Sequence, residues 1–187
     1  MRKNEITHLF AKTEQLASER LLFRKMQKKD ASDMFDYAKR PEVTRYLLWH
    51  EHPDLTYTKR YLAFVEACYR TGKFFDLAVI HRESNRMIGT CGFAHIDFSN
   101  NAAELGYVLH PDFWNCGIAT EAASRILQYG FEVLGLHRIE ARYMKDNLAS
   151  RRVMEKCGMR FEGIQRGLMQ IKGRYEDIGV FAKTEED

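Results

Sequence analysis

A glycine opens the stretch of this chain whose backbone is best suited to binding a ligand. The run FWNCGIATEAASRIL, residues 113–127, places Gly117 and the small Ala119 directly before an apolar helical stripe. The first N–H groups of a helix have no partner within the helix, and the helix dipole favours negative charge there. The stretch therefore predicts a phosphate site made of main-chain groups. Small residues here also serve ordinary packing of a strand against a helix, so other parts of the sequence must distinguish the two.

Other phosphate and metal signatures are missing from the sequence. It contains no GxxxxGK[ST] loop and no strand-borne GxGxxG followed by an acidic partner, which argues against nucleoside triphosphates and dinucleotides as ligands. Its seven histidines include no HExxH spacing, and its four cysteines are scattered without a CxxC pair. We therefore expect no metal site, no disulfide framework and a reducing, cytoplasmic setting.

The composition limits the size and the class of the protein. With 187 residues, of which 45% are apolar, the chain can fill one core, and we expect a single domain. The net charge of +3 comes from interspersed charges, whereas a dedicated nucleic-acid binder usually shows a basic patch. No apolar run has the length of a signal peptide or a membrane span, so we expect no membrane association.

The helix that follows Gly117 is the clearest element in the sequence. Its apolar residues recur at helical spacing on one face, while charged and polar residues take the other face. A stripe of this kind must pack on a sheet. It consists of Ala119, Ala122, Ala123, Ile126, Leu127, Gly130, Phe131 and Leu134.

The remaining pattern predicts a sheet flanked by helices. Asp30 or Ser32 and, later in the chain, Asn147 suit helix N-caps, and Gly158 suits a C′ position. We expect an α/β (α+β) fold with a mixed, mostly antiparallel central sheet of about seven strands. The predicted strands lie within residues 18–26, 74–80, 86–96, 102–110, 137–144, 159–171 and 174–182, and the predicted helices within 28–40, 58–70, 118–134 and 147–158.

The run ELGYVLHPDFWNCGIATEA, residues 104–122, resembles the phosphate loop of the GCN5-related N-acetyltransferases (GNAT). That loop follows the pattern Gln or Arg, two residues, Gly, one residue, and Gly or Ala. Gly117 and Ala119 supply its last two positions. Trp114 stands where Gln or Arg would be, which is typical of the branch that resembles the ribosomal-protein alanine N-acetyltransferases. The segments NLASRRVMEKCGM and IKGRYEDIGVFA are similar to that branch too.

The resemblance covers residues 18–183 and implies an N-acetyltransferase domain over 18–187, with an N-terminal extension over 1–17. It implies acetyl-coenzyme A (acetyl-CoA) as the cosubstrate. Main-chain N–H groups of residues 115–120 would hold the pyrophosphate, and the strand before them would run beside the pantetheine arm. The residues implied to bind the cofactor are Tyr107, Val108, Leu109, Trp114, Asn115, Cys116, Gly117, Ile118, Ala119, Thr120, Asn147 and Ser150.

Two residues are candidates for the catalytic chemistry that the resemblance implies. Glu104 is the candidate base, directly or through water, because the matching strand in this family often carries an acid near the acetyl group; the alternative is a solvent-facing strand carboxylate. Ser150 is the candidate near the leaving sulfur, where a hydroxyl would stabilise a thiolate or relay a proton. The alternative is a serine that bonds locally in the first turn of its helix. Many relatives use a tyrosine acid at the position held here by Met154.

The segment YLLWHEHPD, residues 46–54, is predicted to border the acceptor site, as the corresponding loop does in this fold. Trp49 and Glu51 are the candidate substrate contacts, since an aromatic face and a carboxylate both suit an ammonium group. The alternative is an exposed polar loop with a half-buried tryptophan. Cys116 is not expected to act as a nucleophile, because no base is tied to it and direct transfer needs no acyl-enzyme.

We therefore expect an enzyme that transfers acetyl from acetyl-CoA directly to a primary amine. The N-terminal α-amine of a protein is the leading acceptor, and a polyamine, an aminoglycoside or another small amine is the alternative. A non-catalytic acyl-CoA-binding module is the alternative from another class. The small net charge disfavours direct nucleic-acid binding, and exposed strand edges would permit a homodimer.

Overall fold

The computed structural model describes residues 16–72 and 74–187, which form one sheet of seven strands with helices on its faces. The strands are β1 (Leu21–Arg24), β2 (Phe75–His81), β3 (Arg86–Asp97), β4 (Ala102–Leu109), β5 (Arg138–Met144), β6 (Arg160–Ile171) and β7 (Arg174–Thr184). Their order in the sheet is β1-β2-β3-β4-β5-β7-β6. Only β4 and β5 are parallel neighbours among these strands. The predicted fold class is confirmed.

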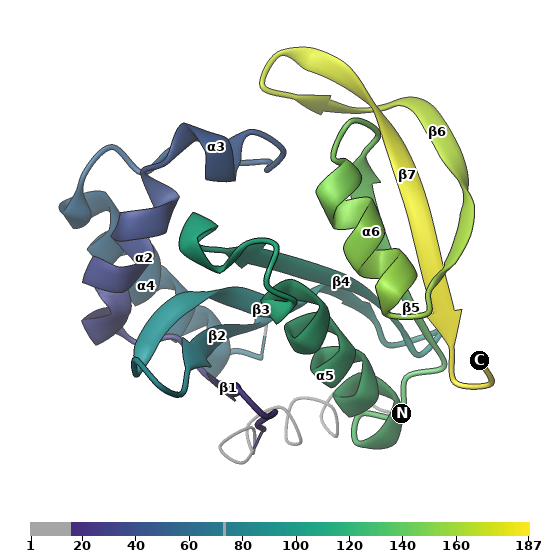
Figure 1. The fold of residues 1–187 in the computed structure, drawn as a ribbon, viewed down its shortest axis with the longest axis horizontal. Helices are drawn as coiled ribbons and strands as arrows, with labels where there is room; N and C mark the ends of the chain where they lie inside the picture. The colour runs from purple at the N-terminus through teal and green to yellow at the C-terminus, as the bar shows by residue number, and fades with distance from the viewer. Residues whose placement is uncertain (1–15, 73) are drawn as a thin grey trace.

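Helices cover both faces of the sheet (Figure 1). They are α2 (Ala31–Ala38), α3 (Pro41–Thr44), α4 (Leu55–Arg70), α5 (Ile118–Glu132) and α6 (Leu148–Lys156), with 3-10 turns η2 (Lys28–Asp30) and η3 (Pro111–Phe113). Strand residues alternate between two cores. Leu77 and Leu105 pack on the side of α5 and α6, whereas Ala78 and Ile80 pack on the side of α2 and α4. Each face of the sheet therefore has its own core and its own set of side chains.

The stripe predicted on α5 faces the sheet. Ala122, Ile126 and Leu127 are buried, and Ala119 and Phe131 at its margins are partly buried. At Gly130 a Cβ atom would lie 2.6 Å from Ile139 Cδ1 and 2.9 Å from Phe93 Cζ. The glycine thus allows the helix to approach β3 and β5 closely.

One helix begins elsewhere than predicted, and another has its predicted N-cap residue without the cap hydrogen bond. α4 begins at Leu55 rather than 58, because the Asp54 carboxylate accepts the N–H of Tyr57 at 2.7 Å and caps the helix. α2 has Asp30 at its N-cap, but this carboxylate accepts the N–H of Gln27 and pairs with Arg24 at 2.7 Å instead of capping. The residues before it form η2, and α2 lies within the predicted range 28–40.

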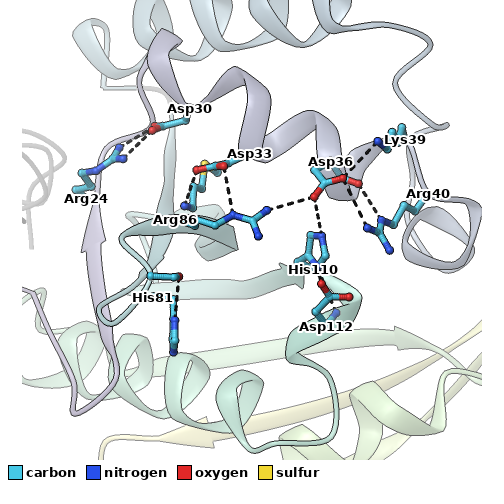
Figure 2. Close-up of polar contacts among 12 residues, drawn as sticks. Arg24, Asp30, Asp33, Asp36, Lys39, Arg40, His81, Arg86, His110 and Asp112 are labelled. Carbon is cyan, nitrogen blue, oxygen red and sulfur yellow. Dashed lines mark hydrogen bonds and ion pairs between the residues drawn. The ribbon is translucent and has the colours of Figure 1, made fainter.

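Acidic side chains on α2 attach this helix to the sheet (Figure 2). Asp33 lies 3.6 Å and Asp36 3.2 Å from the guanidinium group of Arg86 on β3. Asp36 also accepts from Nε2 of His110, the residue that follows β4, at 3.2 Å. Burial alone would raise the pKa of Asp36, but hydrogen bonds from His110 and Lys39 outweigh it and lower the pKa to about 2.

His110 transmits this attachment to the turn after β4. Its imidazole is buried, and its Nδ1 accepts the backbone N–H of Asp112 at 3.2 Å. Nε2 must then carry the proton, so the imidazole donates to Asp36 while it accepts from η3. Helix α2 thereby fixes the point at which the chain leaves β4 and turns toward α5.

The β6–β7 hairpin is attached to α3. Lys172 at the hairpin turn donates from Nζ to the backbone carbonyl of Thr44 at 2.7 Å. Tyr46 packs with Met144 and two hairpin residues in a small separate core. Lys172 and Gly173 both have positive φ, as a two-residue hairpin turn requires. The contact ties the end of α3 to the turn of the hairpin.

The parallel pair β4–β5 is short. It joins four residues of each strand, and Leu105 opposite Ala141 is its last pair. Beyond this point β4 stays paired with β3 and β5 stays paired with β7. The second halves of β4 and β5 are therefore not hydrogen-bonded to each other.

Most of the expected N-terminal extension, residues 1–17, lies outside the described residues. Of its last two members, Leu16 is buried in the core and Ala17 forms a bridge with Leu22. Within the described part of the chain, no helix combines the length and the apolar character that crossing a membrane needs.

Replacing Asp36 by Asn should lower the free energy of unfolding at pH 7 by about 1 kcal/mol, a value discounted for the partial exposure of this carboxyl. Because the folded pKa lies below the unfolded value, this stabilisation is present above pH 4 and is lost as the pH falls toward 2. Urea unfolding of both proteins at pH 7, 4 and 3 measures the difference. The exposed Glu83→Gln is the control, and a difference that does not shrink in acid would contradict the assignment.

Candidate active site

The loop between β4 and α5 has the geometry of an anion site. Asn115 and Gly117 have positive φ values of 61° and 83°, and Gly117 is the N-cap residue of α5. Within the described part of the chain, none of the six N–H groups from residue 115 to 120 donates to a protein acceptor. Residues 114–117 are exposed. The corner is thus open to a ligand, as the sequence predicts.

The cation beside this loop comes from the start of the domain. Arg20 donates from Nη1 to the carbonyl of Cys116 at 3.0 Å, and its Nη2 lies 3.5 Å from the place of a Cβ on Gly117. Its Nε donates to Glu121 at 2.6 Å, and Ser18 donates to the same carboxylate at 2.7 Å. Sequence reasoning missed Arg20, because about a hundred residues separate it from the loop and no local pattern links them.

Glu121 holds these groups in place from the first turn of α5. Burial alone would raise the pKa of this carboxyl. The N–H of Arg20, the hydroxyl of Ser18 and the Arg20 guanidinium together lower the pKa by more than burial raises it, so the pKa lies below its usual value. The carboxylate is therefore ionised at neutral pH, and part of the Arg20 guanidinium remains exposed toward the loop.

Two side chains of the loop are used for its own structure. Trp114 donates from Nε1 to the carbonyl of Leu109 at 2.9 Å and leaves 42% of its surface exposed. Cys116 lies with Sγ 3.0 Å from the carbonyl of Phe113. Trp114 therefore closes the turn at the end of β4, and any contact it makes with a ligand uses the exposed part of its ring.

The edge of β4 beside this loop is available for backbone pairing. Tyr107, Val108 and Leu109 pair with β3 on one side, and the last pair with β5 lies before them at Leu105. Strand residues direct alternate N–H and C=O groups to the two sides. The free side of this segment is thus a place where an extended, amide-containing ligand can add to the sheet.

Tyr107 and Ser150 meet on the α6 side of β4. The Tyr107 hydroxyl lies 2.8 Å from Ser150 Oγ and donates to the Ser150 carbonyl at 3.1 Å. Burial, the largest cause, raises the pKa of Tyr107 above its ordinary value, so this phenol stays protonated. The sequence identified both residues but not their contact, which depends on how close α6 lies to β4.

Asn147 caps α6 as predicted. Its side-chain oxygen accepts the N–H of Ser150 at 3.2 Å, which fixes the first turn, and Gly158 at the other end has φ of +73°. Met154, at the place where many relatives have a tyrosine, is buried in the core. The phenol near Ser150 is therefore supplied by the strand and not by α6.

Glu104 lies on the opposite face of β4, at the end of the parallel pair. It stands across from Glu140 on β5, and Arg142 places Nη1 3.7 Å from its carboxylate. Arg142 also binds Glu140 at 2.8 Å. Burial raises the pKa of Glu104 above its usual value, although Arg142 opposes the effect. The raised pKa makes this carboxylate a better proton acceptor than an exposed one.

The two predicted acceptor residues occupy the segment between α3 and α4. Trp49 packs on the α4-side core with its ring centroid 5.4 Å from that of His52. Glu51 accepts a short hydrogen bond from the Thr44 hydroxyl, and this bond is the largest cause that lowers the pKa of its carboxyl. The backbone carbonyl of the same Thr44 accepts a hydrogen bond from Lys172. The segment is therefore tied to the β6–β7 hairpin.

The four cysteines are free thiols. No group of three or more His, Cys, Asp or Glu side chains among residues 16–72 and 74–187 is arranged to hold a metal ion.

Comparisons with known proteins agree with this geometry. The model of the acetyltransferase (GNAT) domain family matches residues 20–160. An uncharacterized N-acetyltransferase, p20, from Bacillus licheniformis is 34% identical over 169 residues, which cover 90% of this chain and 95% of the relative. The solved structure of a GNAT-family acetyltransferase from Bacillus anthracis is 31% identical, with a TM-score of 0.82 over 92% of this chain and 99% of that one. The [ribosomal protein uS5]-alanine N-acetyltransferase of Escherichia coli is 24% identical and covers 92% of this chain and 91% of its own length.

Replacing Glu121 by Gln should lower the free energy of unfolding by about 2 kcal/mol, because Arg20 loses its charged partner in a partly buried setting. Urea unfolding at neutral pH measures the change. The control is Glu132→Gln on the exposed side of α5, where the carboxylate accepts from Gln128. Equal effects of the two substitutions would show that the Arg20 contact does not stabilise the loop.

Proposed function

The chain belongs to the GNAT family of acetyltransferases, and on this premise we propose that it transfers the acetyl group of acetyl-CoA to a primary amine, with the N-terminal α-amine of a protein as the leading acceptor. The observation that carries the proposal is the open corner at residues 115–120. Its unpartnered N–H groups lie at the end of a strand whose free edge leads to a hydroxyl pair and a carboxylate.

Acetyl-CoA fits this arrangement along its whole length. The pyrophosphate would accept from the N–H groups of residues 115–120, where the α5 dipole also favours negative charge. Arg20 adds a positive charge beside them. The amide groups of pantetheine would pair with the free edge of β4, and Asn147 would offer its side-chain nitrogen. The thioester would then lie near Leu105, where β4 and β5 separate.

The reaction is a direct displacement in a ternary complex. The amine nitrogen attacks the thioester carbonyl carbon, the C–S bond breaks as the amide forms, and coenzyme A leaves as a thiolate that takes up one proton. A backbone N–H of β4, from Val108 or Leu109, would polarise the carbonyl oxygen. Holding the two reactants in line supplies much of the rate, since effective molarities reach about 10⁵ M or more.

Proton transfer is divided between the two faces of β4. Glu104 would accept the proton of the attacking amine, directly or through water. On the other face, the Ser150 hydroxyl would donate a hydrogen bond to the thiolate. The Tyr107 hydroxyl would then donate to Ser150 Oγ in place of the Ser150 carbonyl. Because burial raises its pKa, Tyr107 stays protonated and does not take up a proton in this reaction.

Two arguments favour a protein α-amine as the acceptor: the low pKa of its ammonium form, and the similarity of this chain to an enzyme that acts on a protein N-terminus. An α-amine with a pKa near ~8 is partly neutral at physiological pH, so it needs a weaker base than a lysine side chain. The uS5-alanine N-acetyltransferase is similar over nearly the whole chain. A small amine is the second candidate, favoured by the aromatic rings of Trp49, Tyr57 and Tyr61 around His52 on the α4 side of the sheet.

A thiol-release assay tests the function. The purified chain is given acetyl-CoA with peptides that begin in Ala or Ser, with the same peptides N-terminally blocked, and with polyamines and aminoglycosides. Amine-dependent release of coenzyme A, with the acetylated product identified by mass, supports the enzyme. Tight coenzyme A binding without release for any amine would instead support a binding module.

Gly117→Glu should weaken coenzyme A binding at least about a hundredfold, because a side chain at positive φ is strained and its carboxylate would face the phosphates. Calorimetry measures the affinity. Gly117→Ala is the matched control, since it shares the backbone strain without the charge, and it should bind much closer to the natural protein. Unchanged affinity in the Glu variant would count against the placement of the pyrophosphate.

Ser150→Ala should lower kcat about tenfold to a hundredfold with little change in the KM for acetyl-CoA, because the lost hydrogen bond acts mainly on the developing thiolate. Tyr107→Phe should lower kcat in the same direction but less. The exposed Tyr175→Phe on the hairpin serves as the control. If kcat survives in both variants, the leaving thiolate is stabilised by other groups.

A further inference from the structure

A half-buried carboxyl, that of Asp76, lies on the same face of the sheet as Glu104, two strands away from it. Asp76 on β2 is paired with Gly92 on β3, and Gly92 is paired with Gly106 on β4. Residues paired in this way point to one face, here the face of α2 and α4 that also carries Ala78. Asp76, Gly92 and Gly106 therefore form one row across the sheet, and Gly106 is the first residue of β4 beyond the parallel pair.

The two glycines keep this row free of side chains. A Cβ on Gly92 would lie 2.5 Å from Asp76 Cα and 3.0 Å from its Oδ1, so only glycine lets the carboxyl extend over β3. A Cβ on Gly106 would meet only Ala94 Cβ, at 3.8 Å, so there is open space above Gly106 that a side chain could occupy. With strands about 5 Å apart, the carboxyl extends to within about 5–10 Å of the β4 edge.

The Asp76 carboxyl has hydrogen-bond donors, and no cation of the described residues lies in an ion pair with it. Oδ1 accepts the N–H of Leu77 at 3.0 Å, and the Thr90 hydroxyl binds the carboxyl as well. No lysine, arginine or histidine among residues 16–72 and 74–187 forms an ion pair with it. Burial raises its pKa to about 7 despite these hydrogen bonds, so part of the carboxyl is ionised at neutral pH. A cation beside it would favour the ionised form.

Tyrosines surround this carboxyl from the helix side. Burial is the largest cause that raises the pKa of Tyr37 on α2 and of Tyr61 on α4, and the nearby negative charge of Asp76 raises both further. The Tyr37 side chain is 1% exposed, and its hydroxyl has no hydrogen-bond partner in the described part of the chain. An unsatisfied buried hydroxyl destabilises the fold, and a ligand's polar group next to it would remove that cost.

A surface hollow reaches one member of this cluster, Tyr61. Tyr61 lines a hollow together with Tyr57, Arg60 and Phe64, of which Tyr57 and Phe64 are well exposed. Asp76 itself keeps part of its surface accessible. Aromatic faces beside a carboxylate are the surroundings that ammonium groups favour in proteins.

We propose that Asp76, together with the Tyr37 and Tyr61 hydroxyls, anchors a second ammonium group of the acceptor while its first amine reacts at the end of β4. This inference rests on the proposed function and narrows its substrate class to amines that carry a further positive charge. Such a charge occurs on a diamine or polyamine and on a peptide with a basic side chain near its α-amine.

Acceptor pairs that differ in one charge test the proposal. One pair is a linear diamine and the monoamine of equal length, and the other is a peptide with Lys as its second residue and the same peptide with norleucine. In the natural protein the dicationic member of at least one pair should have a KM at least about tenfold lower, as a charge-assisted hydrogen bond implies. The pair that shows the preference identifies the source of the second charge, and no preference in either pair overturns the proposal.

Asp76→Asn should abolish this preference by raising the KM of the dication, while kcat and the KM of the monocation stay within about twofold. Glu83→Gln, an exposed carboxyl in the β2–β3 turn, should keep it. Tyr37→Phe retains the packing and removes the unpartnered hydroxyl, so it should raise the KM of the dication several-fold without lowering the free energy of unfolding. This variant keeps the test decisive if Asp76→Asn does not fold, and a preference that survives in Tyr37→Phe would then exclude the subsite.

Binding without turnover separates this inference from the proposed function. Calorimetry of each amine with the full chain, with and without coenzyme A, reports the anchor even if no acetyl group moves. Binding of the dication that depends on Asp76, without thiol release for any amine, would keep the subsite and refute the enzyme. Equal thiol release for both members of each pair would support the enzyme and refute the subsite.

Discussion

The parting of β4 and β5 is the constraint on which the site depends. Two parallel strands that stayed paired along their length would satisfy each other's backbone groups and leave no edge for a ligand. Here the pairing stops at Leu105 and Ala141, and each strand keeps its partner on the outer side. The backbone groups of the next β4 residues are thereby directed into the opening, held in a rigid sheet and not in a flexible loop.

The two faces of the sheet divide the chemistry around this opening. The face of α5 and α6 holds the anion loop and the Tyr107–Ser150 pair, which suit the cofactor and its leaving thiolate. The face of α2 and α4 holds Glu104, which suits the incoming amine. In the proposed reaction, an attack across the opening would bring nucleophile and leaving group from opposite sides, and the helices on each face would need only to position their own set of groups.

Sequence reasoning succeeded where the signal is local. The stripe of α5, the start of α5 directly after Gly117 and the cap at Asn147 each follow from a pattern within a few residues, and all three are found in the structure. It failed where two distant segments meet. Neither the contact of Arg20 with the loop nor the hydroxyl pair of Tyr107 and Ser150 leaves a local trace, because each depends on how closely two elements pack.

The shortness of the same parallel pair also bears on how the chain folds. Strands β1 to β4 lie side by side in sequence order, with α2 to α4 inserted between β1 and β2. Strands β5 to β7 form a second group that is close in sequence. Local contacts form quickly, whereas pairings across a long connection pay a larger loop-closure cost. Only four residue pairs join the two groups as a sheet. The junction that creates the binding edge is therefore expected to assemble after its two halves, which makes it the slow step in reaching the active fold.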